Sequence, residues 1–266
     1  MLHKEGFKKY PTNLFIDYSI WGLIIPLFRT LGLMRIHSTI LALYFLHIGI
    51  IFAQNSHLSP KINCDTAYFH FEDYIDSMKI YETQMGKNKN LSTNDERLKL
   101  AFFVALNRYP ELHRKRITLK HKPISSTMQA QPSPDFLFKR KSKRAYRIFV
   151  NNNPNLTGIN YEELSFNGLV GWIGHEFAHL IDYNSMNNRA LLSFIGGYVF
   201  DKRTMRRTER NADRETIKRG LGIQLLDGVA FFEKNNKVSQ KYRKRKQKNY
   251  LSEAEIIVDI QRICNH

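Results

Sequence analysis

The sequence SFNGLVGWIGHEFAHLID occupies residues 165–182, and it decides how the rest of the chain is interpreted. Its large apolar side chains recur at steps of three and four, the spacing of one face of an α-helix. These residues are Phe166, Leu169, Val170, Ile173, Phe177, Leu180 and Ile181. Ser165 stands directly before them and is a candidate N-cap. The pattern predicts a long amphipathic helix that buries this face in a core.

The same stretch contains a His-Glu-x-x-His motif, formed by His175, Glu176 and His179. Residues four apart lie on one face of a helix, so both imidazoles can point at one metal ion. Glu176 lies beside them and can take a proton from a water molecule on that metal. This is the arrangement of a zinc hydrolase, so a metallopeptidase is the first hypothesis. A surface helix with two unrelated histidines is the alternative.

Three glycines precede the second histidine in this helix, at Gly168, Gly171 and Gly174. Each costs up to ~1 kcal/mol relative to alanine in a helix interior, so their presence needs a reason. A bare helix face that lets substrate or backbone approach closely is one explanation. Close packing of another element is the other, and the sequence leaves both open.

Two carboxylates downstream, Glu209 and Asp213, are also four residues apart on a probable helix. A catalytic zinc ion usually has three protein ligands and one open position, so two histidines leave one ligand to find. Asp182 and Ser185 stand where a metzincin has glycine and its third histidine, which excludes that class. Glu209 can ligate zinc, and Asp213 can accept a hydrogen bond from the far nitrogen of a ligating histidine.

The His-Glu-x-x-His motif followed by Glu-x-x-Ala-Asp at residues 209–213 resembles the gluzincin metallopeptidases. It is most similar to the group that contains the bacterial heat-shock membrane protease and the CAAX prenyl protease. The resemblance spans residues 140–230 and does not extend to the membrane spans of that group. It implies a zincin fold with one Zn²⁺ held by His175, His179 and Glu209. It further implies Glu176 as the general base and Asp213 as the carboxylate that orients a histidine.

The expected activity is therefore zinc-dependent hydrolysis of peptides or proteins by a secreted or membrane-associated metalloendopeptidase. A catalytically silent zincin-like binding protein and a basic surface-binding protein are the alternatives. The reaction also needs a donor for the oxyanion. Tyr183, Tyr198 and His121 are available, and the sequence does not select one of them.

The apolar run at residues 38–53 suits the hydrophobic region of a signal peptide, since a membrane span needs about 20 residues. Met34 and Arg35 resemble a start followed by a basic region, and Ala53 resembles a cleavage site. We expect residues 1–33 to be a mis-assigned upstream segment, 34–53 a signal peptide and 54–266 one exported catalytic domain. An uncleaved membrane anchor is the alternative.

The chain has two cysteines, Cys64 and Cys264, and a net charge of +17. In an oxidising compartment the two cysteines are candidates for a disulfide, with two isolated thiols as the alternative. Basic runs at residues 139–144 and 243–248 favour an anionic surface as a partner, and ordinary solvated surface is the alternative. Nucleic acid is not expected, because no nucleic-acid-binding motif accompanies these runs and the protein is expected to be exported.

The order of the predicted elements indicates an α+β fold, with a small mixed or antiparallel sheet and a helical C-terminal half. Strands are expected at residues 116–120, 126–130 and 145–150. Besides the motif helix, helices are expected at residues 67–84, 93–110 and 190–200, around Glu209 and ending at Gly220, and at residues 223–233 and 252–264. Thr93 to Glu96 and Ser252 to Glu255 are candidate capping boxes that open the helices at 93–110 and 252–264. In zincins the strand at the cleft edge pairs with an extended peptide. The resemblance and chain order assign this role to the third strand, with Tyr146, Ile148 and Val150; an ordinary core strand is the alternative.

Overall fold

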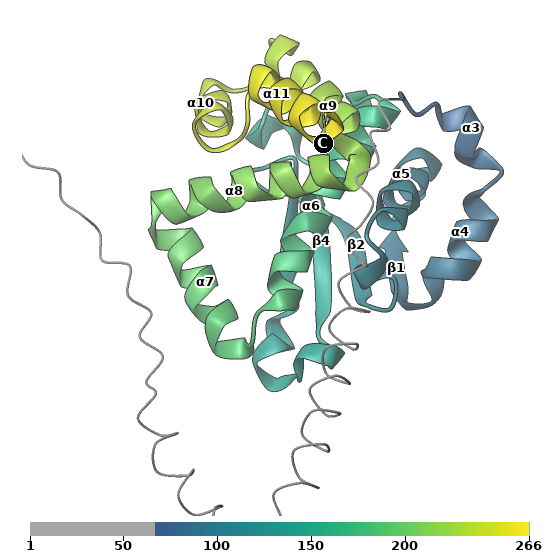
Figure 1. Cartoon of the computed structure of the whole chain (residues 1–266), viewed down its shortest axis with the longest axis vertical. Helices are drawn as coiled ribbons and strands as arrows, with labels where there is room; N and C mark the ends of the chain where they lie inside the picture. The colour runs from purple at the N-terminus through teal and green to yellow at the C-terminus, as the bar shows by residue number, and fades with distance from the viewer. Residues whose placement is uncertain (1–66, 266) are drawn as a thin grey trace, which may run out of the picture. The chain divides into compact units, whose positions relative to one another are not determined.

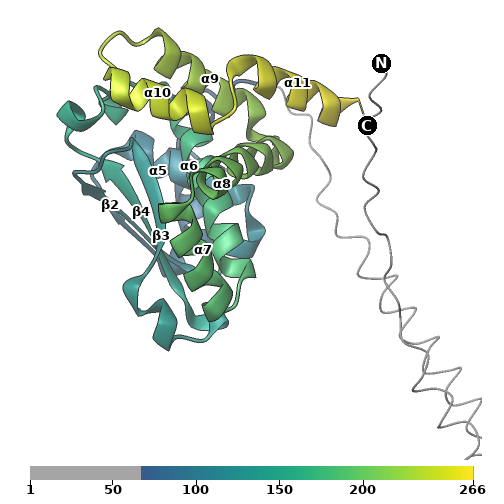
Figure 2. The same cartoon turned by 90° about the vertical axis from the view of Figure 1, so that its left-hand side faces the viewer.

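The computed structural model describes residues 67–265, which form an α+β fold. Its helices are α3 (Phe71–Ile75), α4 (Met78–Met85), α5 (Glu96–Asn107), α6 (Phe166–Ser185), α7 (Asn188–Phe200), α8 (Lys202–Thr216), α9 (Gly222–Lys234), α10 (Gln240–Asn249) and α11 (Glu253–Cys264). Its strands are β1 (Lys89–Ser92), β2 (Arg116–Lys122), β3 (Met128–Pro132) and β4 (Ala145–Asn151). The helices lie mainly on one side of the sheet (Figure 2).

The predictions for the N-terminal region fall outside the described residues. These are the upstream segment 1–33, the signal peptide 34–53, the first residues of the 54–266 domain, and Cys64. The candidate disulfide therefore stays a prediction, and its other member, Cys264, is exposed at the end of α11. Within residues 67–265, none of the helices has the length and apolar character needed to cross a membrane.

The sheet is mixed and has the strand order β1-β2-β4-β3. β1 pairs with β2, and β2 with β4, in parallel, whereas β3 runs antiparallel to β4. Ile117 and Leu119 of β2 are buried beneath the helices, while Lys120 and Lys122 extend over the ring of Phe149. One face of the sheet thus belongs to the core, and long basic side chains cover part of the other.

The prediction that the third strand of the sequence forms the cleft edge is wrong. That strand is β4, which lies between β2 and β3 and is hydrogen-bonded on both sides. Tyr146, Ile148 and Val150 are fully buried core residues. The prediction followed chain order, but β3, which precedes β4 in the chain, pairs with the side of β4 that faces away from β2 and so forms the edge of the sheet. The strand at the sheet edge that contacts α6 is therefore β3.

Helix α6 is the central element, and it contacts α5, α8, α9 and β3 (Figure 1). The predicted N-cap is confirmed, because the Ser165 hydroxyl accepts a hydrogen bond from the Gly168 N–H at 2.8 Å. Nearly every residue of α6 up to Leu180 is buried, including its polar residues. This burial explains why an apolar stripe alone underestimates how much of the helix the core encloses.

The glycines of α6 face packed neighbours rather than an open face. A Cβ atom on Gly171 would lie 2.3 Å from the backbone carbonyl of Gln224 in α9. A Cβ atom on Gly174 would lie 2.7 Å from the side chain of Leu221, just before α9, whereas one on Gly168 would only reach ordinary contact with the Cα atom of Gly228, at 3.4 Å. Gly171 in particular therefore lets α9 approach the backbone of α6 closely, which is the second of the two explanations.

The segment before β2 belongs to the fold. Helix α5 packs against α6 and buries eight consecutive or near-consecutive residues between Leu98 and Leu106. It begins later than predicted: Asp95, not Thr93, is its N-cap, and the Asp95 carboxylate accepts from the Leu98 N–H at 3.1 Å. The Thr93 hydroxyl instead accepts from the Asp95 N–H, so it shapes the turn before the helix.

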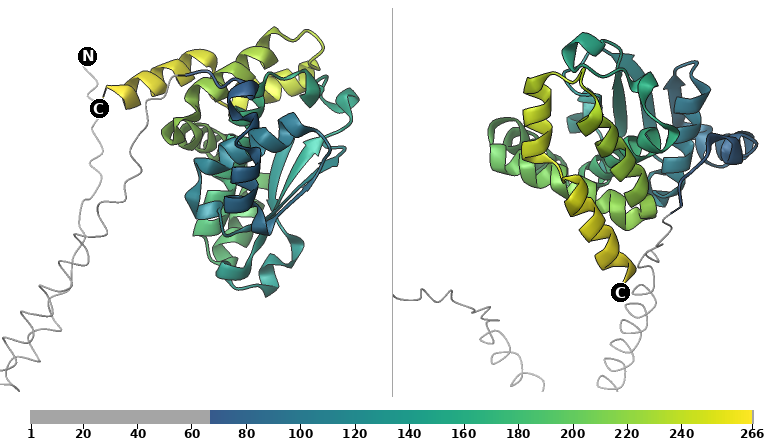
Figure 3. Two further views of the ribbon diagram at one scale, coloured as in Figure 1. Left: turned by 90° about the vertical axis from the view of Figure 1, so that its right-hand side faces the viewer. Right: turned by 90° about the horizontal axis from the view of Figure 1, so that it is seen from above.

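The helices of the C-terminal half follow the predicted order. Figures 1 and 3 show α9, α10 and α11 together at one end of the body. The capping box at the start of α11 is confirmed, with reciprocal hydrogen bonds between Ser252 and Glu255. Helix α8 ends at Thr216 and continues as a π-helical turn in which Gly220 has φ 76°, a conformation that favours glycine.

One strand and one α-helix of the described residues were not predicted, and each lacks the apolar pattern on which prediction depends. Strand β1 has the short polar sequence KNLS, and α10 has the sequence QKYRKRKQKN. The basic run 243–248 lies in α10. In the other run, Arg144 is only 1% exposed and donates to the carbonyl oxygens of Tyr183 and Met186, so that residue is not solvated surface.

Candidate metal centre

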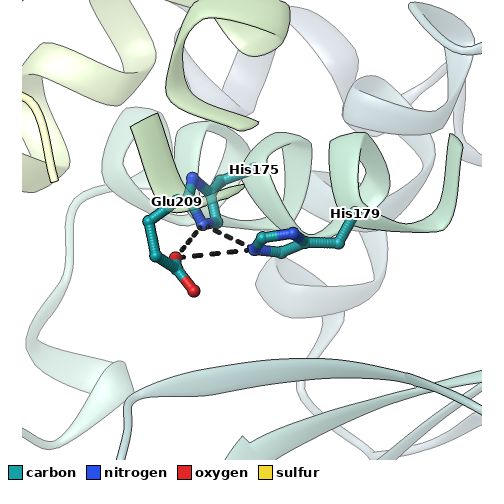
Figure 4. Close-up of side chains that lie close together, drawn as sticks. All are labelled: His175, His179 and Glu209. Carbon is teal, nitrogen blue, oxygen red and sulfur yellow. Dashed lines mark hydrogen bonds and ion pairs between the residues drawn. The ribbon is translucent and has the colours of Figure 1, made fainter. Parts of the chain in front are cut away.

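The structure brings His175 and His179 of α6 together with Glu209 of α8 (Figure 4). The two Nε2 atoms lie 3.1 Å apart. The Glu209 Oε2 atom lies 3.1 Å from Nε2 of His175 and 3.5 Å from Nε2 of His179. All three side chains are buried, and together they can hold one metal ion.

Asp213 lies one turn after Glu209 in α8 and fixes the orientation of His175. Its Oδ1 atom is 2.8 Å from Nδ1 of His175, and its Oδ2 atom accepts from the Leu251 N–H at 2.8 Å. A hydrogen on Nδ1 leaves the Nε2 lone pair of His175 free to bind a metal. His179 has no such partner within residues 67–265, and its ring instead stacks on Tyr183 with centroids 6.2 Å apart.

Glu176 follows His175 and points toward the edge strand β3. Its Oε2 atom accepts a hydrogen bond from the Ala130 N–H at 2.5 Å. Burial raises the pKa of this carboxyl group above its ordinary value, and the electrostatic influence of the neighbouring His179 and His175 partly opposes the rise. A carboxylate with a raised pKa is the better proton acceptor for general base catalysis.

Glu209 stays ionised in this environment. Burial by itself would raise its pKa, but His179 and His175 outweigh that effect and hold the pKa well below the usual value. The hydroxyl group of Tyr198, from α7, donates a hydrogen bond to the second carboxylate oxygen of Glu209. Burial and the Glu209 charge both raise the pKa of Tyr198, so the hydroxyl keeps its proton. The carboxylate therefore has one oxygen, Oε2, facing the histidines.

The three candidate oxyanion donors do not lie together. Tyr198 contacts Glu209, and the hydroxyl of Tyr183 donates to the Ala130 carbonyl oxygen at 3.4 Å. His121 instead contacts Thr93, and its ring is tilted against that of Tyr161 with centroids 5.2 Å apart, so it does not belong to this group of side chains. The structure thus reduces the candidates from three to two.

A cavity of about 230 Å³ lies beside the candidate metal ligands. His175 and Glu176 form part of its wall, and the remaining wall is mostly apolar. The apolar and aromatic lining residues are Met128, Trp172, Leu225, Val229, Phe232, Tyr242, Tyr250 and Leu251. The cavity also meets Thr127 and Met128 at the start of β3, so a group in the cavity would lie next to the edge strand and to Glu176.

Sequence reasoning missed several residues of this centre. Tyr250 packs its ring 5.5 Å from that of His175, and Lys246 of α10 lies 3.5 Å from the Tyr250 ring centroid. Ala130 supplies the N–H group that holds Glu176. None of these residues belongs to a recognisable motif, because their positions depend on how β3 packs against α6 and how α10 packs against α8.

No protein-family model matches this chain, and no curated protein or solved structure matches it significantly.

Proposed function

We propose that this protein is a zinc-dependent metallopeptidase of the gluzincin type, built on a zincin-like core. The convergence of His175, His179 and Glu209, with Glu176 beside them, carries this proposal. These four side chains come from two helices, α6 and α8, and His175 and Glu209 are 34 residues apart in the sequence. Two unrelated histidines on a surface helix would be exposed, whereas both are buried here.

The donor atoms have the spacing that zinc requires. Ligand atoms about 2.0–2.1 Å from a tetrahedral zinc ion are roughly 3.3–3.4 Å from one another. The observed separations among the two Nε2 atoms and Oε2 are 3.1, 3.1 and 3.5 Å. Two imidazoles and one carboxylate also form the donor set of many catalytic zinc sites, which keep one position open. The residues present therefore fit this ion.

Each residue of the candidate centre would have its own role in hydrolysis. His175, His179 and Glu209 would hold the ion, while Asp213 keeps the His175 tautomer that exposes Nε2. Zinc, when bound, would lower the pKa of a coordinated water molecule and polarise the carbonyl group of the substrate. Glu176 has Oε2 held by the Ala130 N–H, so Oε1 is available to accept a proton and return it to the leaving amine.

The substrate would be an extended peptide beside β3. This strand is at the edge of the sheet and faces α6, so its outer edge can pair with a peptide. The N–H and carbonyl groups of Ala130 are bonded to Glu176 and Tyr183, so a peptide would pair along β3 at positions other than Ala130 while Glu176 stays held. The apolar cavity would then receive a bulky apolar or aromatic side chain next to the cleaved bond.

The test compares cleavage of an unbiased peptide library by the wild type, Glu176→Gln and Glu209→Ala, with zinc content measured on each protein. We expect wild-type cleavage, stoichiometric zinc but at least about a hundredfold slower cleavage for Glu176→Gln, and loss of zinc for Glu209→Ala. Glu72→Gln is the control, because Glu72 is exposed on α3. Zinc binding without cleavage by the wild type would refute the peptidase, and equal rates for Glu176→Gln would refute the role of the base.

A further inference from the structure

Helix α7 is apolar on two faces, and among residues 67–265 only one of them packs against other elements. The inner face packs toward the metal centre: Leu191 is buried, and the Phe194 ring lies 5.8 Å from that of Tyr183. A helix with apolar side chains all around is ordinarily enclosed by protein or lipid. The outer face of α7 therefore needs an explanation.

The outer face is formed by Leu192, Val199 and Phe200, with Gly196 between them. Their spacing of seven and eight residues places them on one side of the helix. They are 53%, 59% and 89% exposed, respectively. A Cβ atom on Gly196 would have no heavy atom within 4 Å. Within residues 67–265, this face is not covered.

A second exposed apolar group adjoins the start of the helix. Leu137 and Phe138 end the 3-10 helix η5 (Pro134–Phe138), and Phe138 is 87% exposed. The Asn188 side chain, at the first residue of α7, donates to the Leu137 carbonyl oxygen at 3.1 Å and so joins the two elements. We call Leu137, Phe138, Leu192, Val199 and Phe200 the α7 patch.

Basic side chains flank the α7 patch. Arg189 is exposed at the start of α7, and four exposed basic residues follow Phe200 in α8: Lys202, Arg203, Arg206 and Arg207. The nearby acidic groups are engaged. Asp201 caps α8 by accepting from the Arg203 and Thr204 N–H groups, and Asp135 pairs with Lys139 at 4.0 Å. The surface around the patch is consequently cationic.

We propose that the α7 patch docks this protein onto an anionic membrane surface, with α7 lying in the plane of the interface. Exposed apolar side chains flanked by lysine and arginine are the composition of such interfacial helices. With 13 residues, α7 is about 20 Å long and too short to span a bilayer.

A second copy of the chain is the less suitable occupant. It would bring the same basic residues against the patch, on a protein whose net charge is already +17. Docking on lipid also has a consequence for the metal centre, because α7 carries Tyr198, which holds Glu209. The centre would lie one helix away from the membrane surface, where it would meet membrane-associated chains.

The test is a site-specific fluorescent label in the full chain. With Cys64→Ser and Cys264→Ser as background, an environment-sensitive dye is attached at Phe200→Cys or, as the control, at Ile80→Cys. Ile80 is 55% exposed in α4 and lies outside the patch. Vesicles of phosphatidylcholine with phosphatidylglycerol should shift emission to the blue and block iodide quenching at position 200 only. A local label separates α7 from any contact made by residues 38–53.

The charge contribution is tested by replacing the four basic residues of α8 with glutamine. Vesicle partitioning should weaken by roughly fivefold for each charge removed. The control removes four exposed charges elsewhere by substituting glutamine at Lys79, Lys87, Arg114 and Lys218.

Three results would overturn the proposal. The first is a label at position 200 that stays accessible on anionic vesicles or responds equally to phosphatidylcholine alone. The second is equal weakening by the two quadruple variants, which would indicate net charge only. The third is protection of the label without vesicles together with a dimeric mass, which would assign the patch to a second copy.

Discussion

Replacing Gly171 with alanine tests the packing on which the centre depends. The added Cβ atom would lie 2.3 Å from the backbone carbonyl carbon and oxygen of Gln224 and 2.5 Å from the Leu225 nitrogen. Backbone atoms cannot rotate away as a flexible side chain can. Since ordinary contact begins near 3.4 Å, α9 must move by about 1.1 Å, the difference between 3.4 and 2.3 Å.

The magnitude follows from two opposing terms. Overpacking of this kind costs about 1–3 kcal/mol, and alanine in place of glycine returns up to ~1 kcal/mol of helix propensity. Moving α9 also disturbs Gln224, whose side-chain nitrogen donates to the Ala67 carbonyl oxygen at 2.9 Å and to Asn167 at 3.1 Å. We therefore expect the free energy of unfolding to fall by about 2 kcal/mol.

The assay is urea denaturation followed by circular dichroism, with free zinc buffered at one concentration because bound metal adds stability. For a chain of this size the midpoint should fall by roughly 1 M. Gly196→Ala is the control, since its Cβ atom meets no neighbour, and it should raise stability by about 0.5–1 kcal/mol. A Gly171→Ala midpoint at or above that of the wild type would refute close packing of α9 and restore the open-face explanation.

Two further predictions concern hydrogen bonds made by charged side chains. Arg144→Met should lower the free energy of unfolding by about 3 kcal/mol or more, because it removes hydrogen bonds to two backbone carbonyl groups at the end of α6. Arg140→Ala, at an exposed position, should leave the free energy of unfolding unchanged in the same denaturation assay. Equal effects of the two substitutions would contradict the buried role of Arg144. Hydrogen bonds from Arg210 and from the Ser252 backbone lower the pKa of Glu255 to about 2. The folded-state pKa lies below the unfolded value, so the stabilisation is present above pH 4.5 and is lost as pH falls toward 2. Because Glu255 is partly exposed, Glu255→Gln should cost only about 0.5–1 kcal/mol at pH 7 and nothing near pH 2; a penalty that persists at low pH would contradict this assignment.

Local sequence patterns were sufficient where the geometry is local. The pairs His175 and His179, and Glu209 and Asp213, share a helix face because a step of four residues is just over one helical turn. The N-cap at Ser165 and the capping box at Ser252 depend on residues three apart, and both are confirmed. The α+β class followed from the order of strand and helix patterns, whereas the choice between a mixed and an antiparallel sheet came from the structure, which has the mixed one.

Boundaries and pairings failed where neighbours in space are distant in sequence. Ile148 belongs to an interior strand because β3 pairs on the outer side of β4, and nothing in the sequence of β4 indicates this pairing. Arg144 stands in a basic run that resembles solvated surface, yet carbonyl groups about 40 residues later enclose it. Strand β1 and helix α10 have polar sequences, so packing alone reveals them.

The side chains that could serve a metal and a proton transfer are recognisable without coordinates, because the chemistry of His175, Glu176, His179 and Glu209 is fixed by residue type and by one helical turn. Three-dimensional packing was needed to learn that the two helices meet with donor atoms 3.1–3.5 Å apart, and that β3 is the edge strand beside Glu176. The approach of α6, α8, α9 and β3 is set by close packing, which depends on the shapes of all the partners together.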